Sequence, residues 1–394
     1  MAVREVKPKV YWVGAIDWDR RIFDELIPLP DGTSYNAYLI IGSEKVALID
    51  TVDPTKVDDL LSNLKASGIN RIDYIIANHA EQDHSGAIPD VLKIYPDAKV
   101  VTNQKCKTFL TDLLLISDDK FLVVGDGDTL SLGDKTLKFI LTPWVHWPET
   151  MVTYLVEDGI LFTCDFFGSH LATSSLFAEE GERILEDAKR YYAEIMMPFR
   201  ATIKKNMEKV AALKPSVIAP SHGPIYRNPT FIMDAYNEWI SDRVKNEVVI
   251  PYVSMHGSTE KMVSYFTDLL MERGITVKPF NLPKSDIGEL AMALVDAATI
   301  VIATPMVLAG AHPAAVYAAF LANALRPKVK FVSMIGSFGW GGMFVEQIKE
   351  LIKNLNAELI EPVIVKGYPK EDDFKALERL ADEIVEKHKS INAV

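Results

Sequence analysis

The segment 78–86, with the sequence NHAEQDHSG, holds the densest group of side chains in this chain that can do chemistry. Four of its side chains can ligate a metal ion and fall within six residues, namely His79, Glu81, Asp83 and His84. The apolar run 74–77 directly precedes them and is typical of a buried strand. Because ligands at the end of a strand can converge on one point, the segment predicts a metal-binding loop.

Three further residues of ligand type stand at the ends of other predicted strands, namely His146 after 136–142, Asp165 after 160–164 and His222 after 215–220. We expect all four strand ends to meet on one rim of the fold. The competing interpretation is that these residues are loop caps and polar turn residues. The ordered set H-x-E-x-D-H, H, D and H argues against that interpretation.

The spacing H-x-E-x-D-H resembles the metal loop of the metallo-β-lactamase superfamily, with one change. The zinc hydrolases carry a second histidine where this chain carries Glu81. An anionic oxygen ligand favours iron or manganese over a nitrogen-rich zinc site. The carboxylates of Glu81, Asp83 and Asp165 offset three of the four charges on two ferrous ions. The alternative is a dinuclear zinc hydrolase that uses a metal-bound hydroxide.

Three loops in the second half of the chain suit a flavin nucleotide. The first joins a strand to a helix and comprises Ser254, Met255, His256, Gly257, Ser258 and Thr259. Its hydroxyls and the helix N-terminus favour a phosphate, although a plain helix cap at Ser258 or Thr259 is the alternative. His256 faces either the phosphate or the solvent.

By their resemblance to the FMN loops of flavodoxins, the other two loops would hold the isoalloxazine ring. One comprises Thr304, Pro305, Met306, Val307, Leu308, Ala309 and Gly310. The opposite wall is the loop 336–342, with Ser337, Phe338, Gly339, Trp340 and Gly341. Trp340 either stacks on the ring or fills the loop. Because the chain has no G-x-G-x-x-G fingerprint, FMN is favoured over NAD or FAD.

The order of the predicted strands and helices that position these residues changes near residue 246. Residues 9 to 165 alternate short strands with a few helices, including a hairpin over 35–42 and 45–50 and helices over 55–67 and 87–95. Helical patterning follows over 181–213, with a break at Pro198, and over 229–245. The second half alternates strands at 248–253, 299–303, 328–334 and 358–365 with helices at 260–273, 313–324, 343–355 and 370–388. This alternation predicts a doubly wound parallel sheet.

Composition limits the classes of function. The chain has 394 residues and a net charge of −12, which argues against a nucleic-acid surface. No apolar run approaches the roughly 18 residues needed to span a bilayer, and no secretory signal is visible at the N-terminus. Only Cys106 and Cys164 are present, so a disulfide framework and a C-x-x-C iron site are excluded. We expect a cytoplasmic protein without membrane or nucleic-acid partners.

Nearly the whole chain resembles a flavodiiron protein, also called an A-type flavoprotein. The resemblance implies an α/β protein with an N-terminal αββα metallo-β-lactamase-like sandwich over 1–246. A C-terminal flavodoxin-like, doubly wound, parallel five-stranded sheet would follow over 247–394. It implies two iron ions and FMN as cofactors. His79, Glu81 and His146 would hold one iron, Asp83, His84 and His222 the other, and Asp165 would bridge them.

The resemblance also implies a function. Electrons from an external donor would pass through FMN to the di-iron site, which would reduce dioxygen to water, nitric oxide to nitrous oxide, or both. The donor would be a rubredoxin or a reduced deazaflavin. A head-to-tail homodimer or a dimer of dimers would bring the flavin of one subunit beside the irons of another. Trp147 would line the gap between the cofactors or pack as an ordinary aromatic residue, and His170 and Tyr192 resemble residues behind the metal ligands.

Two rival interpretations remain open from the sequence. One is a dinuclear metallohydrolase with a regulatory flavodoxin domain. The other is an electron-transfer or redox-sensing protein whose metal site has lost its function. The complete set of ligand positions argues against the second rival, and Glu81 together with the flavin half argues against the first.

Overall fold

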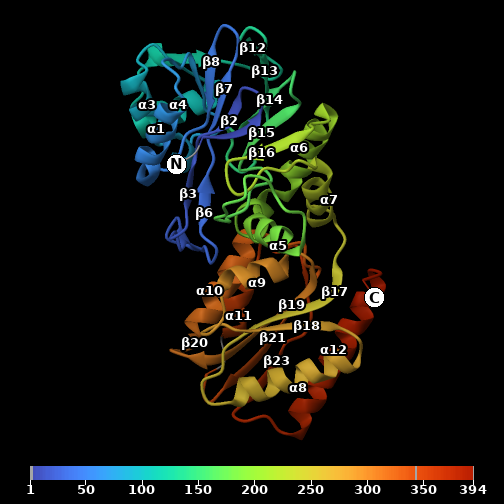
Figure 1. Cartoon of the computed structure of the whole chain (residues 1–394). Helices are drawn as coiled ribbons and strands as arrows, with labels where there is room; N and C mark the ends of the chain where they lie inside the picture. Colours follow the sequence, from blue (N-terminus) through green and yellow to red (C-terminus); the bar gives the residue numbers. More distant parts are fainter. Residues whose placement is uncertain (1–2, 342–343, 394) are drawn as a thin grey trace. The chain divides into compact units, whose positions relative to one another are not determined.

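The computed structural model describes residues 3–341 and 344–393, and the chain divides into two compact units (Figure 1). The first unit comprises Met1–Tyr192 and Phe199–Ile240, and the second comprises Ala193–Pro198 and Ser241–Val394. The predicted boundary between residues 246 and 247 stays a prediction. Gly342 of the predicted flavin loop and Met343 of the predicted helix 343–355 lie outside the described residues.

The first sheet of the first unit is mixed. Its strands in spatial order are β1 (Arg4–Lys7), β2 (Val10–Trp12), β7 (Tyr38–Ile41), β8 (Val46–Ile49), β9 (Tyr74–Ile76), β10 (Lys99–Thr102) and β11 (Phe121–Val123). The predicted hairpin is confirmed, because β7 and β8 pair antiparallel with Tyr38 opposite Ile49. Strands β8 to β11 run parallel, so their carboxyl ends share one edge.

The second sheet consists of β12 (Thr129–Ser131), β13 (Thr136–Leu141), β14 (Met151–Leu155), β15 (Ile160–Cys164) and β16 (Val217–Pro220), in that order. The two sheets face each other across a shared apolar core. The first sheet contributes Ile40, Ile49 and Ile76 to this core, and the second contributes Phe139 and Phe162. Burial of these alternate side chains holds the sandwich together.

Helices cover the outer faces of this sandwich (Figure 1). They are α1 (Val57–Ala66), α3 (Ile88–Ile94) and α4 (Gln104–Leu114) on the first sheet, and α5 (Glu182–Tyr191), α6 (Arg200–Leu213) and α7 (Pro229–Trp239) on the other side. The break predicted at Pro198 is confirmed, since π-helical and 3-10 turns over Tyr192–Phe199 separate α5 from α6. Helix α7 ends at Trp239, earlier than the predicted 245, because the next strand begins at Lys245.

Short elements complete the first unit. These are β3 (Ala15–Asp17) with β6 (Thr33–Tyr35), β4 (Ile22–Phe23) with β5 (Ile27–Pro28), the turns Pro54–Lys56 and Asp118–Lys120, and α2 (Gln82–Ser85). The four layers of helix, sheet, sheet and helix confirm the predicted αββα sandwich.

The second unit is a doubly wound parallel sheet. Its main order is β18 (Thr276–Asn281), β17 (Lys245–Tyr252), β19 (Ala297–Val307), β21 (Phe331–Phe338) and β22 (Glu358–Leu359). Strand β23 (Val363–Lys366) continues the last position on β21, and the short β20 (Gly310–Ala311) pairs with the end of β19. The strand order 2-1-3-4-5 along the chain is that of flavodoxin-like sheets, as predicted.

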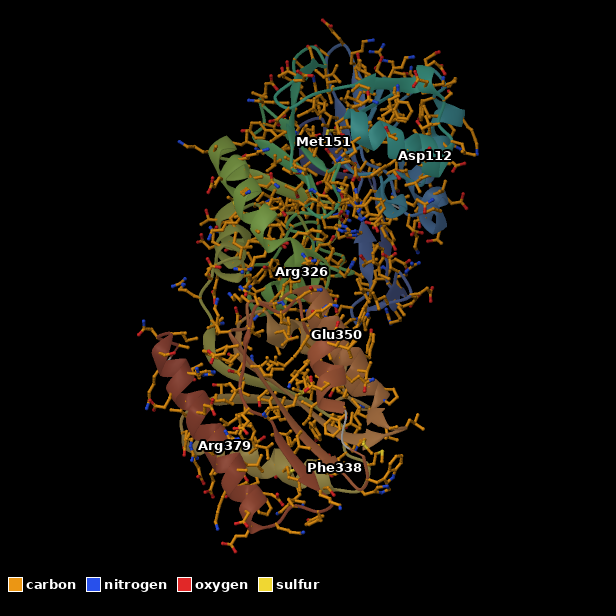
Figure 2. The ribbon with its side chains drawn as sticks, turned by 180° about the vertical axis from the view of Figure 1, so that it is seen from behind. Asp112, Met151, Arg326, Phe338, Glu350 and Arg379 are labelled. Carbon is orange, nitrogen blue, oxygen red and sulfur yellow. The ribbon has the colours of Figure 1, made fainter. Side chains whose placement is uncertain are left out.

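Among residues 241–341 and 344–393, five helices cover the two faces of this sheet. Helices α8 (Ser258–Glu272) and α12 (Glu371–Ser390) bury apolar side chains on one face, and α9 (Ile287–Leu294), α10 (Pro313–Leu325) and α11 (Phe344–Leu351) on the other. Arg326 and Phe338 mark opposite ends of the unit, and Phe338 lies at the carboxyl end of β21 (Figure 2). Across residues 3–341 and 344–393, no helix has both the length and the apolar character to cross a membrane.

A buried histidine in this unit predicts pH-dependent stability. His388 of α12 contacts Thr299 Oγ1 through Nε2 and Asn246 Oδ1 through Nδ1, both at 2.7 Å. Burial lowers its pKa from 6.5 to about 4. The unfolded chain therefore binds a proton more tightly, and stability is lost as the pH falls from 6.5 towards 4. Urea unfolding should show a loss on the order of 2 kcal/mol in the wild type that His388→Gln lacks. Equal pH slopes in both proteins would contradict this prediction.

Candidate metal and flavin sites

The loop after β9 is fixed to both sheets of the first unit. The backbone and side-chain nitrogens of Asn78 donate to the Asp50 carboxylate, each at 2.9 Å. Thr153 of β14 donates to Asn78 Oδ1 at 2.7 Å. Thr51 donates twice to the carbonyl of His84, at 2.7 and 2.6 Å. These bonds hold the ligand-type side chains at one edge of the sandwich.

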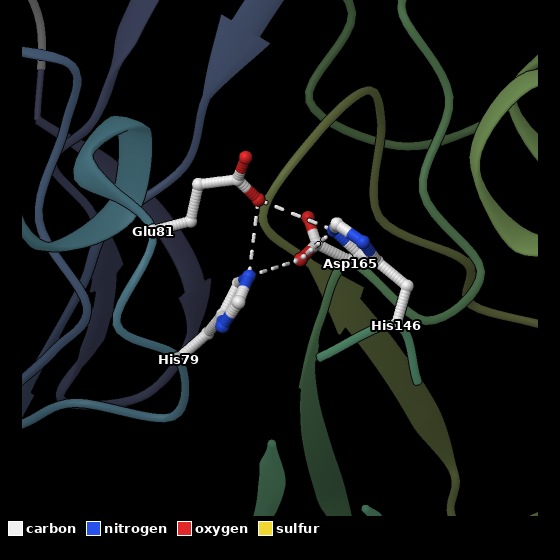
Figure 3. A group of neighbouring side chains, drawn as sticks. All are labelled: His79, Glu81, His146 and Asp165. Atoms are coloured by element: carbon white, nitrogen blue, oxygen red, sulfur yellow. Dashed lines mark hydrogen bonds and ion pairs between the residues drawn. The ribbon is translucent and has the colours of Figure 1, made fainter. Parts of the chain in front are cut away.

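The structure brings the predicted metal ligands together in two groups. We call the first group site A, which comprises His79, Glu81, His146 and one oxygen of Asp165 (Figure 3). Glu81 Oε2 lies 3.1 Å from His79 Nε2 and 3.2 Å from His146 Nε2. Asp165 Oδ2 lies 3.4 and 3.5 Å from the same two nitrogens.

We call the second group site B, which comprises Asp83, His84, His222 and the other oxygen of Asp165. Asp165 Oδ1 lies 2.8 Å from His84 Nε2 and 3.5 Å from His222 Nε2. The Asp83 carboxylate lies 3.3 Å from His84 Nε2 and 3.0 Å from His222 Nε2. Asp165 therefore directs one oxygen to each group, which is the arrangement that a bridging carboxylate needs.

The buried oxygens of these sites fit metal cations. Both oxygens of Asp83 and Oδ2 of Asp165 are buried without a hydrogen-bond donor among the described residues. Unpaired carboxylates are costly to bury, so buried acidic groups usually pair with cations or coordinate metals. The mixed histidine and carboxylate donor set is one that iron accepts. The site residues therefore fit two iron ions.

The carboxylates and histidines of the two sites shift each other's pKa values. Burial alone would lower the histidine pKa values, but Asp165 and Glu81 raise the pKa of His146 to about 9. Asp165 and Asp83 raise the pKa of His222 to about 10. Burial would raise the pKa of Asp165, yet the neighbouring histidines hold it well below its usual range. Asp165 is thus ionised, and metal uptake would displace protons from the histidines.

Partners behind the ligands orient them. Glu149 Oε1 accepts hydrogen bonds from His79 Nδ1 at 2.6 Å and from the Ala80 amide at 3.1 Å. His222 Nδ1 donates to the Ser34 carbonyl at 2.7 Å. In both rings the Nε2 atom is left to face the site, because the Nδ1 proton is already engaged. Neither Glu149 nor the Ser34 carbonyl was predicted as a partner of the ligands.

Removing the Glu149 carboxylate should weaken site A. We expect Glu149→Ala to lower iron affinity about 10- to 100-fold, because His79 loses the acceptor that fixes its ring. Iron retained during titration with a chelator measures the change. Glu149→Gln keeps an acceptor of the same length and should lose less. Equal retention by wild type and Glu149→Ala would contradict the role of Glu149.

The structure distinguishes two adjacent tyrosines. Tyr191, not the predicted Tyr192, reaches the metal site and donates to Asp165 Oδ1 at 2.8 Å. The Tyr192 hydroxyl instead donates to the Trp239 carbonyl at 3.4 Å. The position of His170 agrees with the prediction, because its ring lies 4.9 Å from that of His222 and its Nδ1 contacts Thr33 Oγ1 at 2.9 Å. The Trp147 ring packs edge-on against His79 at 4.9 Å.

A pocket lies at the carboxyl ends of the strands in the second unit. Most of its lining was predicted, namely Ser254, Met255, His256, Ser258, Thr259, Pro305, Met306, Ser337, Phe338 and Gly339. Gly367, after β23, lines the pocket as well and was not predicted. The remaining predicted residues of these loops do not line the pocket, namely Gly257, Thr304, Val307, Leu308, Ala309, Gly310, Trp340 and Gly341. Trp147 belongs to the first unit, and its contact with a flavin stays a prediction.

The N-terminus of α8 at this pocket fits a phosphate. Gly257 is the N-cap residue with φ +85°, and no side chain caps the first turn. The Ser254 hydroxyl accepts from the Gly257 amide at 3.2 Å, and the Thr259 and Ser337 hydroxyls lie 3.0 Å apart. The free amides and the helix dipole favour an anion here. The residues therefore fit the phosphate of FMN.

Known proteins match this chain over most of its length. Residues 33–223 match the family model described as ODP family beta lactamase. A nitric oxide reductase of Moorella thermoacetica is 36% identical over 95% of this chain and 96% of its own length. A coenzyme F420H(2) oxidase of Methanothermobacter marburgensis is 34% identical over 97% and 99%. A type A flavoprotein of Rhodobacter capsulatus is 33% identical over 92% and 86%.

Two solved structures match this chain over nearly its whole length. The rubredoxin oxygen:oxidoreductase of Desulfovibrio gigas has a TM-score of 0.96 at 31% identity, and covers 100% of both chains. The flavodiiron protein of Giardia intestinalis has a TM-score of 0.91 at 28% identity, and covers 99% of this chain and 98% of its own. The chain therefore belongs to the flavodiiron proteins, or type A flavoproteins, a family of oxidoreductases that carry FMN and a di-iron centre.

Proposed function

We propose that this protein reduces dioxygen to water, nitric oxide to nitrous oxide, or both, at a di-iron centre supplied with electrons through FMN. The position of Asp165 carries the proposal, because its two oxygens face two separate sets of ligand atoms. We assign His79, Glu81 and His146 to one iron, Asp83, His84 and His222 to the other, and Asp165 to both.

The cofactors account for the electron count. When bound, FMN supplies two electrons and two ferrous ions supply one each, which matches the four electrons needed to reduce dioxygen to two waters. Nitric oxide reduction needs two electrons for each pair of molecules. The protein's part is to place the groups and to fix their protonation.

The residues around the metal sites perform that part. Glu149 and the Ser34 carbonyl hold the rings of His79 and His222 with Nε2 facing inward. Tyr191 donates to Asp165 Oδ1 and so limits the rotation of the shared carboxylate. Site A is open on one side, because Glu81 and His146 are only partly buried, whereas the site B residues are buried. A small gas molecule can therefore approach from the side of Glu81 and His146.

The electron donor and the assembly belong to the same proposal. Similar proteins are named after F420H(2) and after rubredoxin, which supports an external donor of either kind. The chain itself has only two cysteines, and both are buried, so it carries no rubredoxin-type iron site of its own. We further propose a head-to-tail homodimer, or a dimer of such dimers, that brings the flavin of one subunit to the irons of its partner.

An anaerobic experiment tests the function. The protein is loaded with iron and FMN, reduced fully, and mixed with dioxygen or nitric oxide while flavin reoxidation and the products are followed. Rapid reoxidation with water or nitrous oxide as the product is the expected result. About two irons and one FMN per chain should be found by analysis. Zinc in their place, with hydrolysis of an ester or lactam, would favour the dinuclear metallohydrolase instead.

A further inference from the structure

A surface pocket of the first unit lies behind site B. It encloses about 380 Å³, and its lining includes Leu171, Thr173, Ser175, Glu179, Arg183 and Pro224. Leu171 directly follows His170, and Pro224 lies two residues after His222. The pocket wall therefore continues along the chain into the residues of the metal site. Its lining combines apolar side chains with hydroxyl groups and two charged residues, Glu179 and Arg183.

One face of helix α5 leads from this pocket to the shared carboxylate. Arg183, Asp187 and Tyr191 are spaced four residues apart, so they share a face of the helix. Arg183 lines the pocket, Asp187 is 8% exposed, and Tyr191 donates to Asp165 Oδ1 at 2.8 Å. At 1.5 Å per residue, the three positions span about 12 Å. Asp187 thus lies midway between the pocket and the metal site.

Buried polar atoms without protein partners lie around Asp187. Asp187 Oδ2, Ser169 Oγ and Tyr226 Oη have no hydrogen-bond partner among the described residues. Burial raises the pKa of Tyr226, while the Ser169 hydroxyl lowers it and the Asp187 carboxylate raises it, so these three side chains are neighbours. The backbone of Ser169 also donates to the carbonyl of His222 at 3.2 Å. Buried groups of this kind are usually satisfied by ordered water.

We propose that this pocket and Asp187 form the proton entrance of the metal centre, with water linking Asp187, Tyr226 and Ser169 to site B. The inference rests on the proposed function, since reduction of one dioxygen to two waters consumes four protons and four electrons. The electrons come from FMN and the irons. The Asp187 carboxylate takes each proton from hydronium in the pocket and passes it inward, so it returns to its starting state after every transfer.

The surroundings of Asp187 suit a proton carrier. Burial and the charge of Asp31 raise its pKa to about 7, against the opposing charge of Arg183, and Glu186 adds to the increase while Arg190 reduces it. The Tyr226 hydroxyl also lies beside Asp187. Arg183 is itself paired with Asp31 at 3.2 Å. An acid with a pKa near the working pH can both accept and release protons readily.

Asp187→Asn tests the proposal by three measurements. Dioxygen turnover at neutral pH should fall at least about tenfold with unchanged KM for the gas, and Asp187→Glu should restore part of it. The visible absorption of the oxidised, iron-loaded protein should respond to a pH jump at least about tenfold more slowly in the asparagine variant. In the wild type, the infrared band of a protonated carboxylic acid should disappear near pH 7. The Asp187→Asn variant should lack this band at every pH. Glu182→Gln, which changes an exposed carboxylate of the same helix that does not act on the pKa of Asp187, is the matched control and should behave as wild type in all three.

A stability measurement checks that Asp187 titrates in the folded protein. The pKa of Asp187 is raised from 3.8 to about 7 on folding, so its contribution to stability is fully present below pH 3.8 and is lost as the pH rises through 7. Asp187→Asn should therefore be more stable than the wild type at pH 8. This result also excludes misfolding as the cause of slow turnover.

Two outcomes would overturn the proposal. One is an Asp187→Asn variant with wild-type turnover and wild-type response to the pH jump. The other is a wild-type protein in which no infrared band of a protonated acid depends on Asp187. A wild-type protein that reduces neither gas would refute the proposed function instead, and the pH-jump and infrared measurements would still decide the role of Asp187.

Discussion

Asp165→Ala should lower dioxygen and nitric oxide reduction at least about a thousandfold while FMN stays bound. The substitution removes the one side chain whose two oxygens face both ligand groups, so neither site keeps its full set of donors. Loss of a shared metal ligand removes metal chemistry outright, and charge stabilisation by the metal accounts for several kcal/mol of catalysis. Iron content, flavin content and gas consumption measure the effect in one preparation.

The controls for this experiment separate chemistry from folding. Glu157→Ala changes an exposed carboxylate just before β15, at the end opposite to Asp165, and should leave both metals and turnover in place. The flavin unit should keep its FMN in both variants because it contributes none of the groups of sites A and B. Retained turnover in Asp165→Ala with full iron content would refute the ligand assignment.

Ser258→Glu should weaken FMN binding about a hundredfold. Ser258 is the first residue of α8 and lines the pocket where we place the FMN phosphate. A carboxylate there repels the phosphate and competes with it for the free amides of the first turn, which together amount to roughly 3 kcal/mol. Titration of the flavin-free protein with FMN, followed by quenching of flavin fluorescence, measures the affinity.

The Ser258→Glu substitution should not destabilise the folded protein. An acidic residue in the first turn stabilises a helix, so the flavin-free variant should unfold no earlier than the wild type. Glu260→Gln, in the same turn but exposed, removes a negative charge and should bind FMN at least as tightly as the wild type. Wild-type affinity in Ser258→Glu would show that the phosphate does not bind at α8.

Strand ends made most of the metal site predictable. Ligand types after β9, β13, β15 and β16 converge because parallel and adjacent strands deliver their ends to one edge. His146 and His222 lie far from the loop of His79 in the sequence, and strand-end placement was the signal that joined them. The alternation of strand and helix predicted the flavodoxin-like sheet for the same reason, although β18 and α9 were missed. Strand β18 has no buried residue, and α9 is only 8 residues long.

Side chains behind the ligands could not be predicted in the same way. Glu149 stands in a loop, and nothing in its neighbourhood distinguishes it from an exposed acidic residue, although its side chain is fully buried against His79. Ser34 acts through its carbonyl, which any residue could provide. The choice between Tyr191 and Tyr192 depends on the rotation of α5 just before its π-helical turn, and that rotation is set by packing. The position of Gly367 beside the flavin pocket likewise follows from the end of β23, which the sequence did not separate from β22.

The origin of the ligands in two different sheets has a consequence for the lifetime of the protein. The segment 79–84 belongs to the first sheet, whereas His146, Asp165 and His222 extend from the second. Iron bound by ligands from both sheets would cross-link the two sheets of the folded chain. The unfolded chain would lack this cross-link. At a free metal concentration one hundred times Kd, such binding adds about 2.7 kcal/mol to the free energy of unfolding. The abundance of this protein would then follow the iron supply of the cell through proteolysis of the iron-free chain, before any control of its synthesis.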